Sequence, residues 1–426
     1  MTVRRDGSSR FGDRTKWGTF PSALVGWRVS EENFMAGVGF VNDLKLRASW
    51  GISGNNAIGN YSHIAMMGFS NYTFGNSLAV GQVPTTAPNP DLSWEESQTF
   101  NYGIEVGFLA NRIFTSFDYY NKTKTNLLLN IPVPTATGFG NALANIGEVF
   151  NQGWEWEVTT HNTTGAFRWD TNLNLSHNRN VVRQLGPNIT PIQSGDFDPP
   201  HNIMMVGQPM NTIYVIQRIG IISQDDLDRR VARYGNQTIG DPLYFDADGD
   251  GVITPNDRVM LGDRNPDLVW GITNSFSFAG FDLRVLVQGQ RGGQIYSLFC
   301  RAVDRTGMGF VENTLGVHRN RWRSPEDPGD GSRGRATSRF GFIKNSDWIY
   351  SSDYWRVRNI TLGYDLARLI GTRYVQGARI YVSAENWFGA DKYHGGYNPE
   401  AINSAGDDYG AFPLSKTMTF GMNFTF

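Results

Sequence analysis

The end of the chain alternates strictly between two kinds of side chain. From residue 416 onward it reads K-T-M-T-F-G-M-N-F-T-F, and the positions between the apolar residues carry only Thr, Gly or Asn. Successive side chains of a β-strand point to opposite faces, so this segment predicts a strand with one apolar and one polar face. A transmembrane β-barrel strand has this pattern because one face meets lipid and the other a watery lumen, and a soluble sandwich strand is the alternative. The apolar positions are Met418, Phe420, Met422, Phe424 and Phe426.

The same alternation recurs in segments long enough to cross a membrane as strands, at 44–50, 99–108, 113–124, 167–175, 270–278, 281–288, 360–364 and 380–384. Short connections at 109–112, 161–166 and 279–280 alternate with long polar segments at 52–93, 125–148, 178–269, 291–353 and 387–415. Short turns on one side and long loops on the other are typical of an outer-membrane barrel. We therefore predict an all-β, antiparallel transmembrane β-barrel of about twelve strands. Counting back from the C-terminus places the apolar segment 212–222 in an external loop.

Composition agrees with this class of protein. Charged residues make up 18% of the chain, below the roughly 25% of soluble proteins, and no run of about 18 apolar residues could form a transmembrane helix. The net charge is −2 and the sequence contains no block of basic residues, so nucleic acid is not an expected partner. The single cysteine, Cys300, excludes an internal disulfide and lacks the basic surroundings of an activated thiol.

The first ten residues, M-T-V-R-R-D-G-S-S-R, contain no apolar segment of the kind that a secretory signal requires. A protein of the outer membrane needs such a signal. Two alternatives follow: the chain is a fragment, or the outer-membrane interpretation is wrong.

One local motif predicts a metal site. Residues 246–257 read D-A-D-G-D-G-V-I-T-P-N-D, which matches an EF-hand loop in its acidic positions, its glycine and its closing carboxylate. Calcium takes carboxylate oxygens from alternate residues and one backbone carbonyl, and the shorter closing Asp predicts a modest affinity of ~10⁻⁴–10⁻³ M. An acidic turn without an ion is the alternative. The expected ligands are Asp246, Asp248, Asp250, the Val252 carbonyl and Asp257.

No catalytic motif is evident, which favours a protein that is not an enzyme. The sequence has no H-E-x-x-H, no P-loop and no G-x-S-x-G. Its six histidines occur singly, without the spacing of metal ligands, and we expect each to be solvated or hydrogen-bonded: His63, His161, His177, His201, His318 and His394.

Several blocks along the whole chain, in order, resemble the SusC/RagA family of TonB-dependent transporters from Bacteroidetes. They include W-G-T-F-P-S-A-L-V-G-W (17–27), L-K-L-R-A-S-W-G-I-S-G-N (44–55), P-N-P-D-L-S-W-E (88–95), the D-A-D-G-D-G-V-I loop, N-P-D-L-V-W-G-I-T-N-S-F-S-F (265–278), R-V-R-N-I-T-L-G-Y (356–364), G-Y-N-P-E (396–400) and the final F-T-F.

The resemblance implies that residues 1–426 are the C-terminal part of a larger, 22-stranded barrel in the outer membrane, without its plug domain and signal peptide. It further implies import of oligosaccharides or oligopeptides, energy from TonB, and a SusD-like surface lipoprotein that covers the external mouth. The TonB-coupling residues of the family have no counterpart in this sequence.

Two other functions remain as alternatives: a self-contained, twelve-stranded passive porin, and a soluble calcium-dependent adhesin. External loops on a rigid barrel are where ligand or partner contacts are expected. Aromatic loop residues could stack on sugar rings or seat a lid, although packing within the loops is the better explanation for any single one: Tyr61, Tyr72, Phe74, Trp387, Tyr393 and Tyr397.

Overall fold

The computed structural model describes residues 1–186, 191–195, 200–304, 315–336, 340, 343–366, 376–403 and 406–425. Phe426, the last apolar position of the predicted terminal strand, lies outside these residues.

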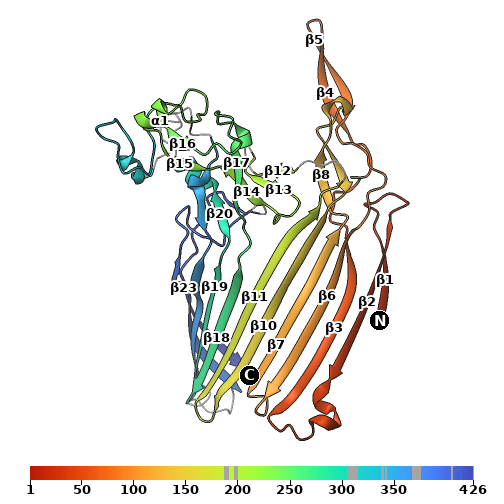
Figure 1. Cartoon of the computed structure of the whole chain (residues 1–426). Helices are drawn as coiled ribbons and strands as arrows, with labels where there is room; N and C mark the ends of the chain where they lie inside the picture. Colours follow the sequence, from red (N-terminus) through yellow and green to blue (C-terminus); the bar gives the residue numbers. More distant parts are fainter. Residues whose placement is uncertain are drawn as a thin grey trace. The chain divides into compact units, whose positions relative to one another are not determined.

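Twelve strands form the main sheet, which confirms the predicted all-β class and strand number (Figure 1). Every adjacent pair whose register is defined is antiparallel. β1 and β25 end the strand order, and the described residues do not pair them with each other. The order is β1 (Thr2–Gly7), β2 (Trp17–Arg28), β3 (Val41–Asn55), β6 (Glu95–Phe108), β7 (Ile113–Thr125), β10 (Glu148–Thr164), β11 (Arg168–Gln184), β18 (Leu268–Phe278), β19 (Phe281–Arg291), β22 (Tyr354–Asp365), β23 (Gly377–Asp391) and β25 (Thr417–Thr425).

In the part of the chain that the structure describes, helices are few and short. The α-helices are α1 (Gln224–Asp228) and α2 (Leu298–Val303), and the 3-10 helices are η1 (Val29–Glu31), η2 (Asn33–Met35), η3 (Thr135–Thr137), η4 (Pro255–Asp257), η5 (Gly316–Asn320) and η6 (Ser346–Trp348). Within the described ranges, no helix has both the length and the apolar character needed to cross a membrane.

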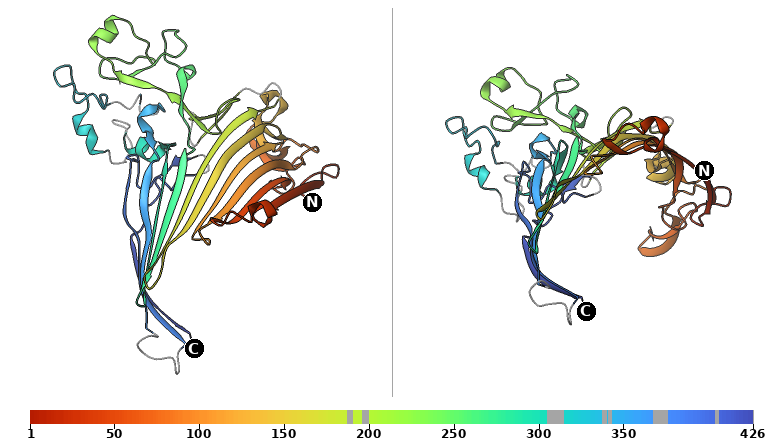
Figure 2. Two further views of the ribbon diagram at one scale, coloured as in Figure 1. Left: turned by 60° about the horizontal axis from the view of Figure 1, so that its bottom comes forward. Right: turned by 90° about the horizontal axis from the view of Figure 1, so that it is seen from below.

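The chain divides into two compact units. The first contains Met1–Thr160, Ser176–Ile192 and Met205–Pro209, and the second contains His161–Leu175, Gln193–Met204 and Met210–Phe426. Within each unit the strands of the main sheet run side by side in every view (Figures 1 and 2).

In the first unit, strand register sorts the side chains by polarity, as the alternation predicts. Leu46 lies opposite Ile104, and Ile104 opposite Phe117, so one face is apolar. On the other face, Arg47 forms ion pairs with Glu105 at 3.0 Å and with Asp118 at 2.5 Å. A shift of one residue would exchange these faces, so the alternation fixes the register.

The long segments at one end of the first unit have their own structure. β4 (Met67–Phe74) pairs with β5 (Ser77–Pro84), and β8 (Leu128–Pro132) pairs with β9 (Asn141–Asn145). A small core supports them, made of Phe11, Phe20, Leu92 and Trp94, with Ile52, Ile58, Leu128 and Leu143 packed against it.

The second unit repeats the two-faced sheet. A continuous apolar row crosses five strands through Phe276, Leu283, Leu362, Val382 and Phe420. On the opposite face, Arg379 forms an ion pair with Asp282.

The long segments of the second unit also fold into small sheets. β12 (Ile192–Ser194), β13 (Asn202–Met204), β14 (Thr212–Ile216) and β17 (Arg258–Gly262) form one sheet, β15 (Arg218–Ile221) and β16 (Pro242–Tyr244) another, and β20 (Gln294–Ser297), β21 (Ile349–Ser351) and β24 (Asp407–Asp408) a third. The prediction that 212–222 stays out of the main sheet is confirmed, because β14 and β15 belong to these small sheets. The segment is apolar because it is packed in a loop core, where Ile213, Val215 and Ile216 are buried.

The predicted connection at 161–166 is wrong in its bounds, since β10 continues to Thr164 and β11 begins at Arg168. The pattern missed these residues because polar side chains such as His161 and Asn162 continue the ladder, where they bond to Asp170 and Thr171 across the hairpin.

We expect the apolar face of the main sheet to meet lipid and the polar face to meet the lumen. Single cysteines placed in the full-length protein at Phe100, Ile104, Leu283, Val285, Phe420 or Phe424 should react with a lipid-soluble maleimide. Cysteines at Glu105, Arg284 or Asn423 should react with a water-soluble one. The opposite pattern at most of these positions would contradict the barrel.

Candidate functional site

The predicted calcium loop, 246–257, follows β16 in the second unit and ends with η4. Its carboxylates Asp246, Asp248 and Asp250 come together, with one oxygen of each within 4.8 Å of the others. Hard cations such as calcium prefer oxygen ligands, so this donor set suits the predicted ion. The structure therefore brings three of the five predicted ligands into one group.

Backbone N–H groups of the loop hold these carboxylates. Asp246 Oδ1 and Oδ2 accept hydrogen bonds from the N–H groups of Gly249 at 2.8 Å and Gly251 at 3.0 Å. Asp250 Oδ1 accepts one from the Val252 N–H at 2.8 Å. Gly249 and Gly251 have φ of +74° and +83°, a conformation that favours glycine and lets the backbone turn around the carboxylates.

Asp257 has a different place from the other predicted ligands. It is fully buried, and its two oxygens accept hydrogen bonds from the N–H groups of Ala247 and Thr254 at 2.8 and 2.7 Å. Thr254 and Asp257 form the capping box that begins η4. The residue that the motif makes the closing ligand thus ties the two ends of the loop together.

The loop is anchored to the core of the second unit. Ile253 is buried beside Tyr244, Ile216, Phe340 and Ile343, and its N–H donates to the Arg233 carbonyl at 3.0 Å. The Val252 side chain is exposed.

Charge crowding in the loop acts on Asp248. The hydrogen bond from the Asp250 N–H lowers the pKa of Asp248, but desolvation and the charges of Asp250, Asp257 and Asp246 together raise it. A cation placed among these carboxylates would relieve that repulsion.

A second polar group, the His201 cluster, consists of His201, Arg264, Lys344 and Asp407. His201 is fully buried, with Nε2 2.8 Å from Asp407 Oδ1 and Nδ1 2.9 Å from Lys344 Nζ. Arg264 Nη2 donates to the same Asp407 oxygen at 2.7 Å. Because an ammonium can only donate, Nδ1 of His201 accepts and its Nε2–H donates to Asp407.

Burial and charge set the protonation of the His201 cluster. Desolvation lowers the pKa of His201, and the Lys344 and Arg264 cations lower it further against the opposing effect of Asp407. Burial raises the pKa of Asp407, but its bonds to His201 and Arg264 outweigh this and leave it below its usual range. The expectation that His201 is hydrogen-bonded is confirmed. No sequence pattern indicated the cluster, because its members come from three separate long segments.

Glu400 ties another long segment to the main sheet. Its carboxylate accepts hydrogen bonds from the Tyr354 hydroxyl at 2.9 Å, from Arg356 at 3.3 Å and from Arg358. All three donors belong to β22. Glu400 closes the G-Y-N-P-E block, so this contact gives the acidic residue of that block a structural role.

The aromatic loop residues divide into two groups. Tyr61, Tyr72 and Phe74 are exposed in the first unit. In the second unit, Tyr393 is buried with its hydroxyl 2.6 Å from Asp408 Oδ2, and Tyr397 is exposed with its ring 5.5 Å from that of Phe299. Trp387 donates its indole N–H to the Thr417 carbonyl at 3.0 Å. The structure therefore buries Tyr393 and leaves the other five exposed: Tyr61, Tyr72, Phe74, Trp387 and Tyr397.

Cys300 is buried in the core of the second unit, with its sulfur 3.0 Å from the Tyr350 hydroxyl. Burial raises the pKa of its thiol to about 11. A thiol in this state is a poor nucleophile.

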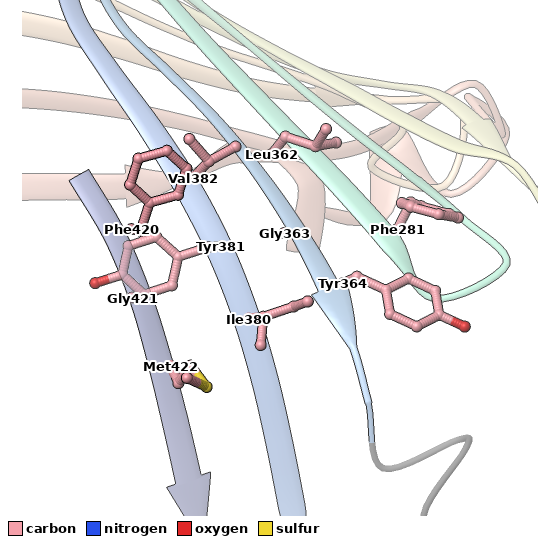
Figure 3. Close-up of a pocket in the computed structure, with 10 residues that line it drawn as sticks. All are labelled: Phe281, Leu362, Gly363, Tyr364, Ile380, Tyr381, Val382, Phe420, Gly421 and Met422. Carbon is pink, nitrogen blue, oxygen red and sulfur yellow. The ribbon is translucent and has the colours of Figure 1, made fainter. Parts of the chain in front are cut away.

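An apolar groove of about 590 Å³ lies across β22, β23 and β25 (Figure 3). Leu362, Ile380, Val382, Phe420 and Met422 line it. These residues belong to the apolar face of the sheet, which a barrel turns towards lipid. The groove is therefore part of that apolar face and not a separate ligand site.

Residues 1–386 match the model of the TonB-dependent receptor-like β-barrel family. The chain belongs to this family.

Curated receptors share the likeness over the whole chain. The TonB-dependent receptor P39 of Formosa agariphila is 31% identical over 478 residues, covering 100% of this chain and 44% of the relative. The TonB-dependent receptor SusC of Bacteroides thetaiotaomicron is 29% identical over 444 residues, covering 100% and 42%. The chain thus spans less than half the length of the curated receptors it matches.

The structure of the RagAB peptide transporter matches with a TM-score of 0.82 at 25% identity, covering 100% of this chain and 45% of that one. The predicted resemblance to SusC and RagA, the β-barrel fold and the outer-membrane location are confirmed. In a TonB-dependent receptor the long segments between strands are the external loops, so we expect the predicted calcium loop and the His201 cluster to lie outside the membrane.

The calcium site remains a prediction that calorimetry can check. The full-length receptor should take up one calcium ion in this loop, and Asp248→Ala combined with Asp250→Ala should abolish that uptake, because two of the clustered carboxylates are lost. The matched control is Asp225→Ala with Asp228→Ala, which removes two exposed carboxylates from α1 and should leave uptake unchanged. Equal uptake by all three proteins would rule out the site.

The His201 cluster predicts a loss of loop stability in mild acid. The folded pKa of His201 lies below its ordinary value of 6.5, so the unfolded loop takes up a proton before the folded one does. The contribution of His201 to loop stability is therefore fully present above pH 6.5, and it is lost as the pH falls towards the folded pKa. The low pKa of Asp407 acts only in stronger acid, below its ordinary value of 3.8.

Hydrogen exchange, corrected for intrinsic rates, measures this effect at 201–204, 343–345 and 406–408. Protection in the full-length receptor should be lower at pH 5.5 than at pH 7.5. In His201→Gln, which cannot titrate, the difference between the two pH values should disappear. A pH effect of the same size in the variant would contradict the assignment.

Proposed function

We propose that this chain forms part of an importer that carries oligosaccharides or oligopeptides across the outer membrane. A SusD-like surface lipoprotein covers its external mouth, and TonB supplies the energy. The likeness to both SusC and the RagAB peptide transporter over 100% of the chain carries this proposal. The proposal includes no catalytic step.

The β4–β5 hairpin of the first unit has the surface of a protein-binding element. Its pairing places Phe69, Leu78 and Val80 on one face, and these side chains are at least two-thirds exposed. Tyr72 and Phe74 lie on the other face, also exposed, with ring centroids 4.9 Å apart. Exposed apolar side chains gathered on one element mark interaction surfaces, and aromatic residues contribute most at such interfaces.

The hairpin lies on the external side of a TonB-dependent receptor barrel, because it belongs to the long connection between β3 and β6. The similarity to SusC and to the RagAB transporter suggests a lid protein as the partner on the external side. We therefore assign the hairpin to the lid contact.

Co-purification and binding measurements test this function. The full-length receptor should co-purify with a SusD-like lipoprotein, and Phe69→Ser with Leu78→Ser should weaken that complex by at least tenfold, because buried apolar contacts are lost. The matched control, Asn71→Ser with Thr73→Ser, alters the same face of β4 without removing an apolar side chain and should bind normally. A receptor that binds its lid equally well in both variants would refute the hairpin contact, and one without any lid or TonB-dependent uptake would refute the function.

A further inference from the structure

The two long external segments of the first unit, 52–93 and 125–148, carry charge only near their C-terminal ends, at Asp91 and Glu148. Neither 52–90 nor 125–147 includes an Asp, Glu, Lys or Arg residue, whereas charged residues make up 18% of the whole chain. The external segments of the second unit are different, because they hold the acidic calcium loop and the His201 cluster. A ligand recognised through ion pairs finds no partner within 52–90 or 125–147.

These two segments enclose a cavity of about 670 Å³ within the first unit. One wall is formed by residues 57–66 and 85–87, and the other by one face of the β8–β9 hairpin. Cavities of a few hundred to about 1,000 Å³ are the usual size of ligand sites.

The cavity has an apolar floor and neutral polar walls. Ile58, Leu128 and Leu143 line it and also pack on the core around Trp94, so the floor is held in place. In one wall, the Thr85 hydroxyl donates to the Met66 carbonyl at 3.0 Å, and the Thr86 hydroxyl accepts from the Met66 N–H at 2.9 Å. The walls are therefore ordered before any ligand arrives.

Two side-chain amides remain available in the opposite wall. Asn130 and Asn141 both line the cavity and are exposed, and no described residue bonds to either side chain. Each amide offers a donor and an acceptor together, which is the complement of a peptide backbone unit. The lining contains no aromatic ring on which a sugar could stack.

We propose that this cavity binds an uncharged, extended stretch of polypeptide. Its backbone amides pair with Asn130 and Asn141, and its aliphatic side chains rest on Ile58, Leu128 and Leu143. The inference rests on the proposed function, because it names the ligand chemistry that the first unit selects. Two sources can supply such a segment: an imported oligopeptide, or a loop of the lid protein.

Gly140 gives a clean way to close the cavity. It lies in the lining, its φ is not positive, and a Cβ added there meets no atom within 4 Å. Gly140→Trp should therefore fill the cavity without straining the hairpin. Gly39 has equally free surroundings just before β3, where no residue lines the cavity, so Gly39→Trp is the matched control.

Peptide binding to the purified full-length receptor tests the proposal. The probe is an end-blocked peptide of alternating Ala and Asn, compared with versions carrying two Asp or two Lys residues and with maltohexaose. The uncharged peptide should bind at least tenfold more tightly than the other three. Gly140→Trp should weaken its binding by at least tenfold, as should Asn130→Leu with Asn141→Leu, and Gly39→Trp should leave it unchanged.

The source of the segment follows from two further measurements. Loss of peptide uptake in Gly140→Trp assigns the segment to the imported ligand, and loss of lid binding assigns it to the partner. Equal binding of charged peptides, tighter binding of maltohexaose, or equal binding by both Trp variants would overturn the proposal. A receptor that binds the uncharged peptide in this Gly140-dependent way but imports nothing would overturn the proposed function and leave the cavity assigned.

Discussion

The structure depends on the pairing of backbone N–H and C=O groups between neighbouring strands. In lipid no water is present to satisfy these groups, so a chain that crosses as strands must pair them with other strands. That requirement makes a wide antiparallel sheet the framework of the whole chain, and it leaves side chains free to alternate between two solvents. Alternation then fixes register, because a shift of one residue would place Arg47 on the apolar face and Leu46 on the polar one.

Contacts on the polar face add to this framework. Arg47 on β3 bridges Glu105 on β6 and Asp118 on β7, and Lys45 approaches the same Glu105 at 3.4 Å. Each cross-strand pair of opposite charge contributes about 0.2–1 kcal/mol. The guanidinium crosses Gly103, where a Cβ would lie 2.6 Å from the Arg47 Nε. Glycine at this position lets one side chain reach two strands, which links three strands through a single cation.

The sequence predicted the sheet well because alternation is a local signal, readable in ten residues such as those ending at Phe424. It placed 212–222 outside the main sheet by counting strands, and the burial of Ile213 and Val215 supplies the physical reason. The sequence also predicted that Asp246, Asp248 and Asp250 lie close together, because a spacing of two residues within one turn determines their proximity. It could not reveal that Asp257 is fully engaged in closing the loop, nor that His201 meets Lys344 and Asp407, because those contacts depend on how distant segments pack.

The external segments of the two units achieve order by opposite means. In the second unit, buried charges such as Asp407 and Arg264 join segments far apart in sequence, and a buried charge is tolerated only when it is paired. Such a core is specific in geometry and sensitive to pH. In the first unit, neutral hydrogen bonds also join distant segments. Asn145 donates to the Ser93 carbonyl at 2.8 Å and accepts from the Ser93 N–H at 2.7 Å. The lining of the cavity in this unit is uncharged, so a ligand bound there is selected by shape and by backbone-like hydrogen bonds rather than by its charge.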